Sequence, residues 1–225
     1  MNIQRQTHAA DGRRTQAERS EATKAALTAA GRRLFADRGY GGVGTEELVQ
    51  AAGVTRGALY HHFEGKADLF RVVFEDVERE LAERFASEAL SRPDPWDGMM
   101  AALEMFLDVC GEPDVQRIAL LDAPWVLGWD TWREIEARYG LGLIKLAFQN
   151  LIDAGLMEPQ PVDPLAHAIL GTLAEAGLYV AGAEDVAAAR ADMGAVLRRM
   201  LDGLRGDATG DRPGAAGGGT AGARR

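Results

Sequence analysis

A tight glycine turn between two short amphipathic segments is the feature that most constrains how this chain can fold. The stretch TEELVQAAGVTRGALYHHF, residues 45–63, places apolar positions on both sides of Ala52-Gly53-Val54. Isolated helices below about 12–15 residues are marginal in water, so neither half is stable alone. Two short helices joined by a glycine turn are typical of the helix-turn-helix, whose second helix enters the DNA major groove. The segment therefore predicts two helices that their neighbours hold and that act as one unit.

Helical periodicity continues on both sides of this segment. Apolar residues recur at steps of three and four over residues 19–37, and again along a long helix from Lys66 to about Leu90. We expect Thr45 to cap the second helix with its hydroxyl. The third helix is expected over residues 55–62.

The remaining chain also follows a helical pattern. Asp94-Pro95 and Asp163-Pro164 each indicate a cap followed by proline in the first turn. No stretch alternates as a strand does, so we expect an all-α fold. The further helices are expected near residues 96–110, 114–122, 129–154, 164–182 and 186–205.

The charge is distributed unevenly along the chain. Residues 1–71 carry 11 Lys and Arg against 8 Asp and Glu, a net of +3, although the whole chain has a net charge of −9. Residues 72–225 carry 14 basic against 26 acidic residues, a net of −12. A basic N-terminal module on an acidic body is the asymmetry expected when one end of a protein meets a polyanion.

The composition argues against several other classes. No run of 18 apolar residues is present, and the polar N-terminus lacks the apolar part of a secretory signal, so we expect a cytoplasmic protein with no membrane span. Cys110 is the only cysteine, which excludes an internal disulfide and a multi-cysteine metal site, and it is expected as a small buried hydrophobe. The histidines form no pair at a spacing of four, so we expect no metal, no cofactor and no catalysis; they are His8, His61, His62 and His167.

The start of the third helix offers the candidate groups for reading bases. Gly57 and Ala58 are small enough to let the backbone approach the base edges. Thr55 and Arg56 stand beside them, and arginine is the commonest side chain for bidentate contact to guanine. The alternative is a compact three-helix module whose polar residues are merely solvated.

Three further side chains are candidates for contacts to the flanking phosphates. Tyr60 and His61 project from the middle of the third helix as hydrogen-bond donors. Lys66 lies at the amino end of the long helix, where free amides and a cation together favour a phosphate.

The strings RRLFADRGYGGVGTEELV and AAGVTRGALYHHFEGKADLF resemble the N-terminal domain of TetR-family transcriptional regulators. The resemblance runs from about Ala22 to Val73. It implies an all-α fold, with a three-helix helix-turn-helix DNA-binding domain joined by a long fourth helix to a helical ligand-binding and dimerisation domain. It also implies a homodimer that binds a palindromic operator and is released by a small molecule. An activator, or a constitutive DNA-binding protein without an effector, is the alternative.

The resemblance also implies roles for individual residues. Thr45, Tyr60, His61 and Lys66 match phosphate-contacting positions, and Thr55, Arg56 and Gly57 match positions that read bases or line the groove. Glu46 and Glu47 depart from the pattern, because some members place a neutral or base-contacting residue there. The domain boundaries that follow are a flexible arm at 1–17, the DNA-binding domain at 18–65, the effector-binding and dimerisation domain at 66–205, and a disordered Gly/Ala-rich tail at 206–225.

A cluster of aromatic residues in the second half of the chain suggests where an effector binds. In DAPWVLGWDTW, Pro124 and Gly128 interrupt the helix where three tryptophans gather. A broken helix with large amphipathic rings would suit the wall of an apolar pocket. We expect a mostly apolar small molecule to bind there, with ordinary core packing as the alternative for any one of these rings. The expected contacts are Phe106, Trp125, Trp129 and Tyr139.

The last two helices are the candidates for a homodimer interface. Two apolar stripes per protomer could form a four-helix bundle across a twofold axis. The alternative is that one stripe only packs on its own domain. The expected stripes are Leu165, Ile169, Leu173 and Ala176, with Gly171 and Gly177 allowing close approach, and Met193, Val196, Leu197, Met200 and Leu204.

Overall fold

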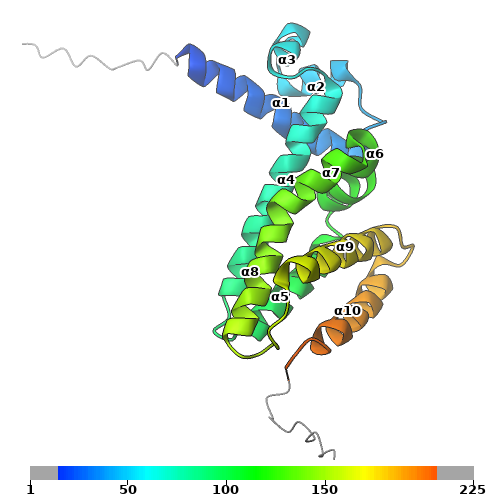
Figure 1. Cartoon of the computed structure of the whole chain (residues 1–225). Coiled ribbons are helices and arrows are strands. Elements are labelled where there is room, and N and C mark those ends of the chain that lie inside the picture. Colours follow the sequence, from blue (N-terminus) through cyan, green and yellow to red (C-terminus); the bar gives the residue numbers. More distant parts are fainter. Residues whose placement is uncertain (1–14, 207–225) are drawn as a thin grey trace, which may run out of the picture.

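The computed structural model describes residues 15–206, and the described residues form helices and no strand. The expected arm at 1–17 and tail at 206–225 therefore lie almost entirely outside the described residues. The all-α fold predicted from the sequence is confirmed for the part that the structure describes. The first three helices form a small module at one end of the molecule (Figure 1). They are α1 (Gln16–Arg38), α2 (Thr45–Ala52) and α3 (Arg56–His62).

The long helix α4 (Lys66–Leu90) leads from this module into a larger helical body (Figure 1). Two segments of the body, η1 and η2, are π-helical, and η2 interrupts the single helix expected over residues 129–154. The elements of the body are α5 (Pro95–Val109), η1 (Val115–Asp122), α6 (Ala123–Leu127), α7 (Trp129–Glu136), η2 (Ala137–Leu141), α8 (Gly142–Asp153), α9 (Val162–Ala181) and α10 (Val186–Asp202).

Local side-chain bonds explain where several helices begin. Thr15 caps α1, accepting from the Glu18 amide while the Glu18 carboxylate accepts from the Thr15 amide. Asp94 caps α5 as expected, accepting from the Asp97 amide at 3.0 Å. Two expected caps are wrong. Gly44 rather than Thr45 is the cap of α2, and α9 begins at Val162, so Asp163 lies within its first turn.

One apolar core joins the N-terminal three-helix module to the body. Leu48 of α2 and Leu59 of α3 are fully buried in a cluster that also contains side chains of α1 and α4. The same cluster of buried side chains continues through α4 to Ile118 of η1 and Trp132 of α7. A second cluster, around Trp96, lies where α5, α8, α9 and α10 meet. Because the first cluster is continuous, movements in the body can reach the module through packed side chains.

The stripe that the sequence assigned to a dimer interface on α9 instead faces the protein's own body. Its apolar side chains pack on the second cluster, and a Cβ added at Gly177 would lie 3.0 Å from Leu120. On α10, Leu197 is buried in the same cluster, whereas Val196 and Met200 remain 49% and 48% exposed. The expected α9 stripe is therefore wrong as an outward surface, because its apolar residues fill the space under α8 and α10.

The helix α9 is also long and apolar enough to meet a length-and-composition test for a membrane span. One such helix is weak evidence, since the core helix of a soluble protein passes the same test. In this structure α9 packs against α8, α10 and η1.

Candidate DNA-binding surface and effector cavity

The turn between α2 and α3 is fixed by a glycine and a cap. Gly53 adopts the left-handed conformation (φ 67°, ψ 30°), which glycine enters without the steric cost that a Cβ imposes. The Val54 amide then donates to the Val49 carbonyl at 3.0 Å. Thr55 caps α3, and its hydroxyl accepts from the Ala58 amide at 3.2 Å. These bonds set the angle at which α3 leaves the module.

The expected DNA contacts of α3 lie together on its exposed surface. The Arg56 guanidinium carbon is 5.6 Å from the centre of the Tyr60 ring, so the two side chains stack. His61 follows on the same exposed segment. A Cβ added at Gly57 would meet only the Thr55 hydroxyl, at 3.9 Å, so the backbone there is open to the outside. The structure thus places small, cationic and hydrogen-bonding groups side by side, with Thr55, Arg56, Gly57, Tyr60 and His61 all exposed.

Two expected phosphate contacts have different surroundings. Thr45 is half-buried in the first turn of α2, and its hydroxyl makes no hydrogen bond with a described residue. The Lys66 ammonium instead donates to the carbonyls of Tyr40 and Val43, both at 2.9 Å, and lies 3.9 Å from the centre of the Tyr40 ring. The ammonium therefore fixes the α1–α2 loop through two of its three N–H groups, and its expected phosphate contact stays a prediction.

Glu46 and Glu47, the two acidic residues that depart from the family pattern, have different surroundings. Glu47 is structural, because its carboxylate accepts from the Gly44 amide at 3.1 Å and from Arg38 at 2.8 Å. The hydrogen bond from Arg38 and the bond from the Gly44 amide lower the pKa of Glu47. Glu46 is exposed beside it. Glu47 therefore links α1 to the start of α2.

Replacing Gly57 with alanine separates DNA binding from folding. The added methyl meets no clash inside the protein, and alanine is favoured over glycine in a helix by about 0.5–1 kcal/mol, so stability should rise slightly. The same methyl would stand between the α3 backbone and a base edge. We expect operator affinity to fall by about tenfold, equal to about 1.4 kcal/mol, when measured by fluorescence anisotropy. Unchanged affinity would show that Gly57 does not approach the DNA.

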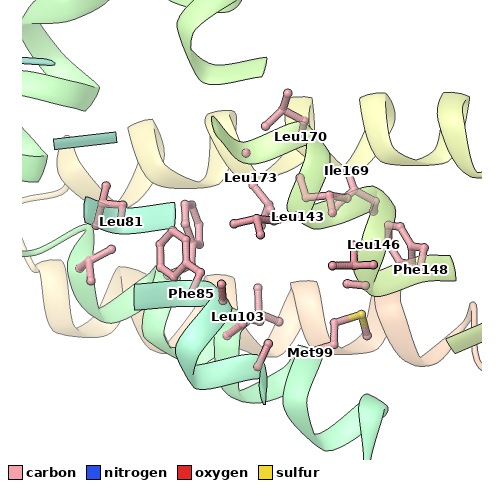
Figure 2. Close-up of a pocket in the computed structure, with 18 of the residues that line it drawn as sticks. Leu81, Phe85, Met99, Leu103, Leu143, Leu146, Phe148, Ile169, Leu170 and Leu173 are labelled. Atoms are coloured by element: carbon pink, nitrogen blue, oxygen red, sulfur yellow. The ribbon is translucent and has the colours of Figure 1, made fainter. Parts of the chain in front are cut away.

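A second candidate site is an apolar cavity in the body. Its volume is about 450 Å³, within the range of about 300–1,000 Å³ that is usual for small-molecule sites. Figure 2 shows side chains from α4, α5, α8 and α9 surrounding it. The labelled lining residues are Leu81, Phe85, Met99, Leu103, Leu143, Leu146, Phe148, Ile169, Leu170 and Leu173.

Two carboxylates interrupt this apolar lining. Burial, followed by the neighbouring charge of Glu136, raises the pKa of Glu78 on α4 to about 8. Burial also raises the pKa of Glu136, although Arg133 opposes the shift by donating to it at 2.7 Å. Cys110 also lines the cavity; burial raises the pKa of its thiol to about 12, so it acts as the small hydrophobe expected from the sequence. Among the described residues no group of three or more His, Cys, Asp and Glu could hold a metal ion.

Comparison with known proteins identifies the chain. Residues 27–73 match the family described as bacterial regulatory proteins, tetR family, and residues 96–204 match the tetracyclin repressor-like C-terminal domain. The crystal structure of a TetR-family transcriptional regulator from Pectobacterium atrosepticum is 36% identical, with a TM-score of 0.76, over 85% of this chain and 98% of that one. The chain belongs to the TetR family of transcriptional regulators.

Two curated relatives agree with this assignment. The Transposon Tn10 TetC protein of Escherichia coli is 22% identical over 84% of this chain and 96% of its own length. The HTH-type transcriptional regulator CymR of Pseudomonas putida is 38% identical over 43% of this chain, and the match spans about half of CymR (49%). The family and CymR identify a DNA-binding transcriptional regulator.

The cavity of this TetR-family regulator is not where the sequence placed it. Phe106 lines the cavity, but Trp125, Trp129 and Tyr139 do not. Trp125 is 89% exposed and Trp129 63% exposed, because Gly128 (φ 78°) turns the chain at the surface between α6 and α7. Of the three clustered indoles, only Trp132 is buried in the core, with its ring centre 4.9 Å from that of Trp129. The expected pocket at the broken helix is therefore wrong.

The lining residues that sequence reasoning missed carried a weak signal. Leu81 and Phe85 belong to the apolar face of the long helix expected from Lys66 to about Leu90, and Ile169 and Leu173 belong to the expected dimer stripe of α9. Glu78 lies on the same face of α4 as Leu81 and Phe85, one and two turns earlier. A carboxylate on an otherwise apolar helix face could have marked this site before the structure was known.

Proposed function

We propose that this TetR-family regulator is a ligand-responsive repressor. It binds a palindromic operator as a homodimer in the cytoplasm and is released by a small, mostly apolar effector. The observation that carries the proposal is the shared helix α4. Its first residue fixes the α1–α2 loop through the Lys66 ammonium, and its second half supplies Leu81 and Phe85 to the cavity wall. One rigid element therefore connects the DNA-binding module to a site large enough for a ligand.

The exposed surface of α3 supports sequence-specific binding to DNA. Arg56 is free of any carboxylate partner within hydrogen-bond distance among the described residues, and it stacks on Tyr60. Stacking limits the positions that the guanidinium can adopt, which lowers the entropy lost when it binds a guanine edge. Tyr60 and Thr45 then supply hydroxyls for the flanking phosphates.

Arg56→Ala tests the DNA-reading role. A bidentate contact to guanine discriminates against the wrong base by about 1–3 kcal/mol, so the ratio of operator to random-duplex affinity should fall by about tenfold per half-site. Tyr60→Phe is the matched comparison, since it keeps the stacked ring and removes only the hydroxyl; it should weaken both duplexes alike. Anisotropy titrations at several salt concentrations measure both ratios. If Arg56→Ala left the ratio unchanged, Arg56 would be a phosphate contact instead.

A dimer is expected because one helix-turn-helix covers few base pairs. Two reading helices about 34–36 Å apart, or a multiple of this spacing, would match a palindromic operator. The outward face of α10 presents Val196 and Met200, and α9 presents Tyr179, which is also exposed. These residues replace the inward-facing α9 stripe as the proposed interface. Light scattering at micromolar concentration tests this assembly, and a monomer would contradict it.

The π-helix η1 provides a second connection between the cavity and the module. Ala119 and Leu120 line the cavity on one side of η1. At its start, Asp114 accepts from Arg32 of α1 at 2.6 Å. At its end, Asp122 accepts from the Tyr40 amide at 2.6 Å. A ligand that displaces η1 would therefore move the C-terminal part of α1 and the loop that follows it relative to α4.

Release of DNA requires the effector to prefer one conformation. A ligand that binds both conformers equally shifts nothing, and a change from about 99:1 to 1:99 needs about 5.5 kcal/mol of differential binding. Two cavities in a dimer could share this energy. The hydrogen bonds that connect η1 to Arg32 and Tyr40 are the contacts through which the ligand's preference for one conformer would change the position of the DNA-binding module.

Asp122→Ala tests this route. Losing the acceptor for the Tyr40 amide should weaken the connection between η1 and the module. A compound that releases wild-type protein should therefore bind the variant normally but release DNA at least several-fold less effectively. Asp122→Asn is the control, because its amide oxygen can still accept from Tyr40. Operator anisotropy with and without the compound measures release, and circular dichroism confirms folding. Full release by a folded Asp122→Ala protein would exclude the Asp122–Tyr40 bond as the route and leave α4 and the Asp114–Arg32 pair.

A further inference from the structure

The two carboxylates of the effector cavity have unequal partners. Glu136 at the end of α7 is paired with Arg133 at 2.7 Å. Glu78 on α4 makes no hydrogen bond or ion pair with any described residue. Its neighbours along the cavity face of α4 are Leu81 and Phe85, so apolar side chains rather than donors surround it. Glu78 is half-buried, so its carboxyl group has lost part of its hydration without gaining a protein partner.

The other charged group of the cavity lies at its edge and is already paired. Arg92 follows α4 and forms an ion pair with Glu88 at 3.3 Å. Glu78, Glu136 and Arg92 are the charged side chains among the lining residues. The cavity therefore has no unpaired cation for an anionic ligand. For a positively charged ligand it has one carboxyl group without a partner, Glu78, and a second carboxyl group nearby, Glu136.

We propose that the effector is a hydrophobic cation, an amine or quaternary ammonium on an apolar body, whose nitrogen lies against Glu78 and near Glu136. This inference rests on the proposed function, in which the cavity is the effector site. The apolar lining from α5, α8 and α9 accommodates the body of the ligand (Figure 2). The carboxylate of Glu78 supplies the ion pair, which is stronger in this half-buried, mostly apolar site than it would be in bulk water.

This recognition would depend on pH in a defined direction. Burial and the charge of Glu136 raise the pKa of Glu78 to about 8, so in the empty cavity Glu78 is mostly protonated at pH 7. A permanent cation favours the ionised carboxylate, so its binding releases a proton. Affinity should therefore rise as the pH increases from 6 to 8 and level off above that. A neutral ligand that accepts a hydrogen bond from protonated Glu78 would show the opposite trend.

Three probes of equal chain length test the proposal on the full-length protein. Decyltrimethylammonium, 1-decanol and decanoate share an apolar body and differ in charge, and calorimetric titration at pH 6, 7 and 8 compares them below their micelle concentrations. The cation should bind at least about tenfold more tightly than either other probe at pH 8, and its affinity should increase by about tenfold or more between pH 6 and pH 8.

Glu78→Gln should abolish both the preference for the cation and its pH dependence, while binding of decanol is retained. Glu83→Gln on the exposed side of α4 is the matched control and should behave as wild type, since Glu83 does not line the cavity. Equal binding of the three probes, no binding of the cation, or a cation affinity that falls with pH would overturn the inference.

Variants that fill the cavity test separately whether the cavity is the effector site. Leu103→Trp fills the cavity and should reduce binding of decanol and of the cation together; Ala147→Leu is a smaller filler should the first variant fail to fold. If the probes bind a folded, filled variant as they bind wild type, the cavity is not the effector site and the proposed function loses its ligand site. If filling blocks all three probes while Glu78→Gln changes nothing, the cavity stands and only the cation is refuted.

Discussion

Glu78→Gln is expected to raise the free energy of unfolding at pH 8 by on the order of 3 kcal/mol, while leaving stability near pH 4.5 almost unchanged. Burial raises the pKa of Glu78 from its ordinary value of 4.5 to about 8 in the folded chain. The folded state therefore holds this proton more tightly than the unfolded state does. The stabilisation from the proton is complete below about pH 4.5 and is lost as the pH rises through about 8. Glutamine carries no such charge, so the variant avoids the loss.

Urea denaturation followed by circular dichroism at pH 5, 6.5 and 8 measures this difference at one fixed protein concentration. Glu83→Gln, an exposed residue of the same helix, is the control and should track wild type at every pH. The pKa of Glu136 is raised in the same direction, so the comparison uses the difference between variant and wild type. Parallel stability profiles for wild type and Glu78→Gln would show that Glu78 is solvated in the folded protein.

If Glu78→Gln gained stability and also lost cation binding, Glu78 would be a residue that serves ligand recognition rather than folding. Binding sites often keep groups that destabilise the fold because those groups recognise the ligand. Glu78 would then be retained for recognition despite its cost to folding.

Gly98→Ala is expected to lower the free energy of unfolding by about 3 kcal/mol, because overfilling a close contact usually costs about 1–3 kcal/mol and sometimes more. Gly98 lies in the first turn of α5, where that helix crosses the end of α4. A Cβ there would lie closer than 3.0 Å to the carbonyl oxygen of Ala89, an approach that real Cβ atoms essentially never show. The obstructing atom belongs to the backbone, so a side-chain rotation cannot relieve it, and α4 must separate from α5.

Gly142→Ala is the matched control for this substitution. Gly142 has helical dihedrals at the start of α8, and an added Cβ meets nothing within 4 Å. Alanine should therefore stabilise this position by up to about 0.5–1 kcal/mol. Thermal and urea unfolding of both variants give the comparison. If Gly98→Ala unfolded like wild type, α4 and α5 would be able to move apart at little cost, and the cavity wall that they form would be deformable.

The sequence by itself determined the local structure of the DNA-binding module. Gly53 identified the turn, because only a residue that enters the left-handed region easily can end α2 there. The apolar positions on both sides of Ala52-Gly53-Val54 predicted two helices held by their neighbours, and Leu48 and Leu59 at these positions are both buried. These features depend on bonds and periodicities within a few residues, so they can be predicted without the rest of the fold.

Sequence reasoning failed where a side chain's environment depends on distant segments. Periodicity shows which residues of α9 share a face, but only the packing of α8 and α10 decides that Ile169 and Leu173 line a cavity rather than a dimer interface. Lys66 begins a helix, yet the carbonyls that its ammonium meets come from residues more than 20 positions earlier.

The proposed effector site shows most clearly the difference between what the sequence predicts and what the packing of distant segments decides. Clustered tryptophans and a broken helix are visible in the sequence, but the direction in which the break turns the chain is not, and Trp125 points into solvent. Glu78 is an ordinary glutamate in the sequence, and its raised pKa arises from its burial at the cavity and from the charge of Glu136, which lies 58 positions later in the chain. The sequence determined the helices and the DNA-reading segment, whereas the tertiary structure alone decided where the cavity lies and which charge it contains, because burial depends on every segment that packs around a residue.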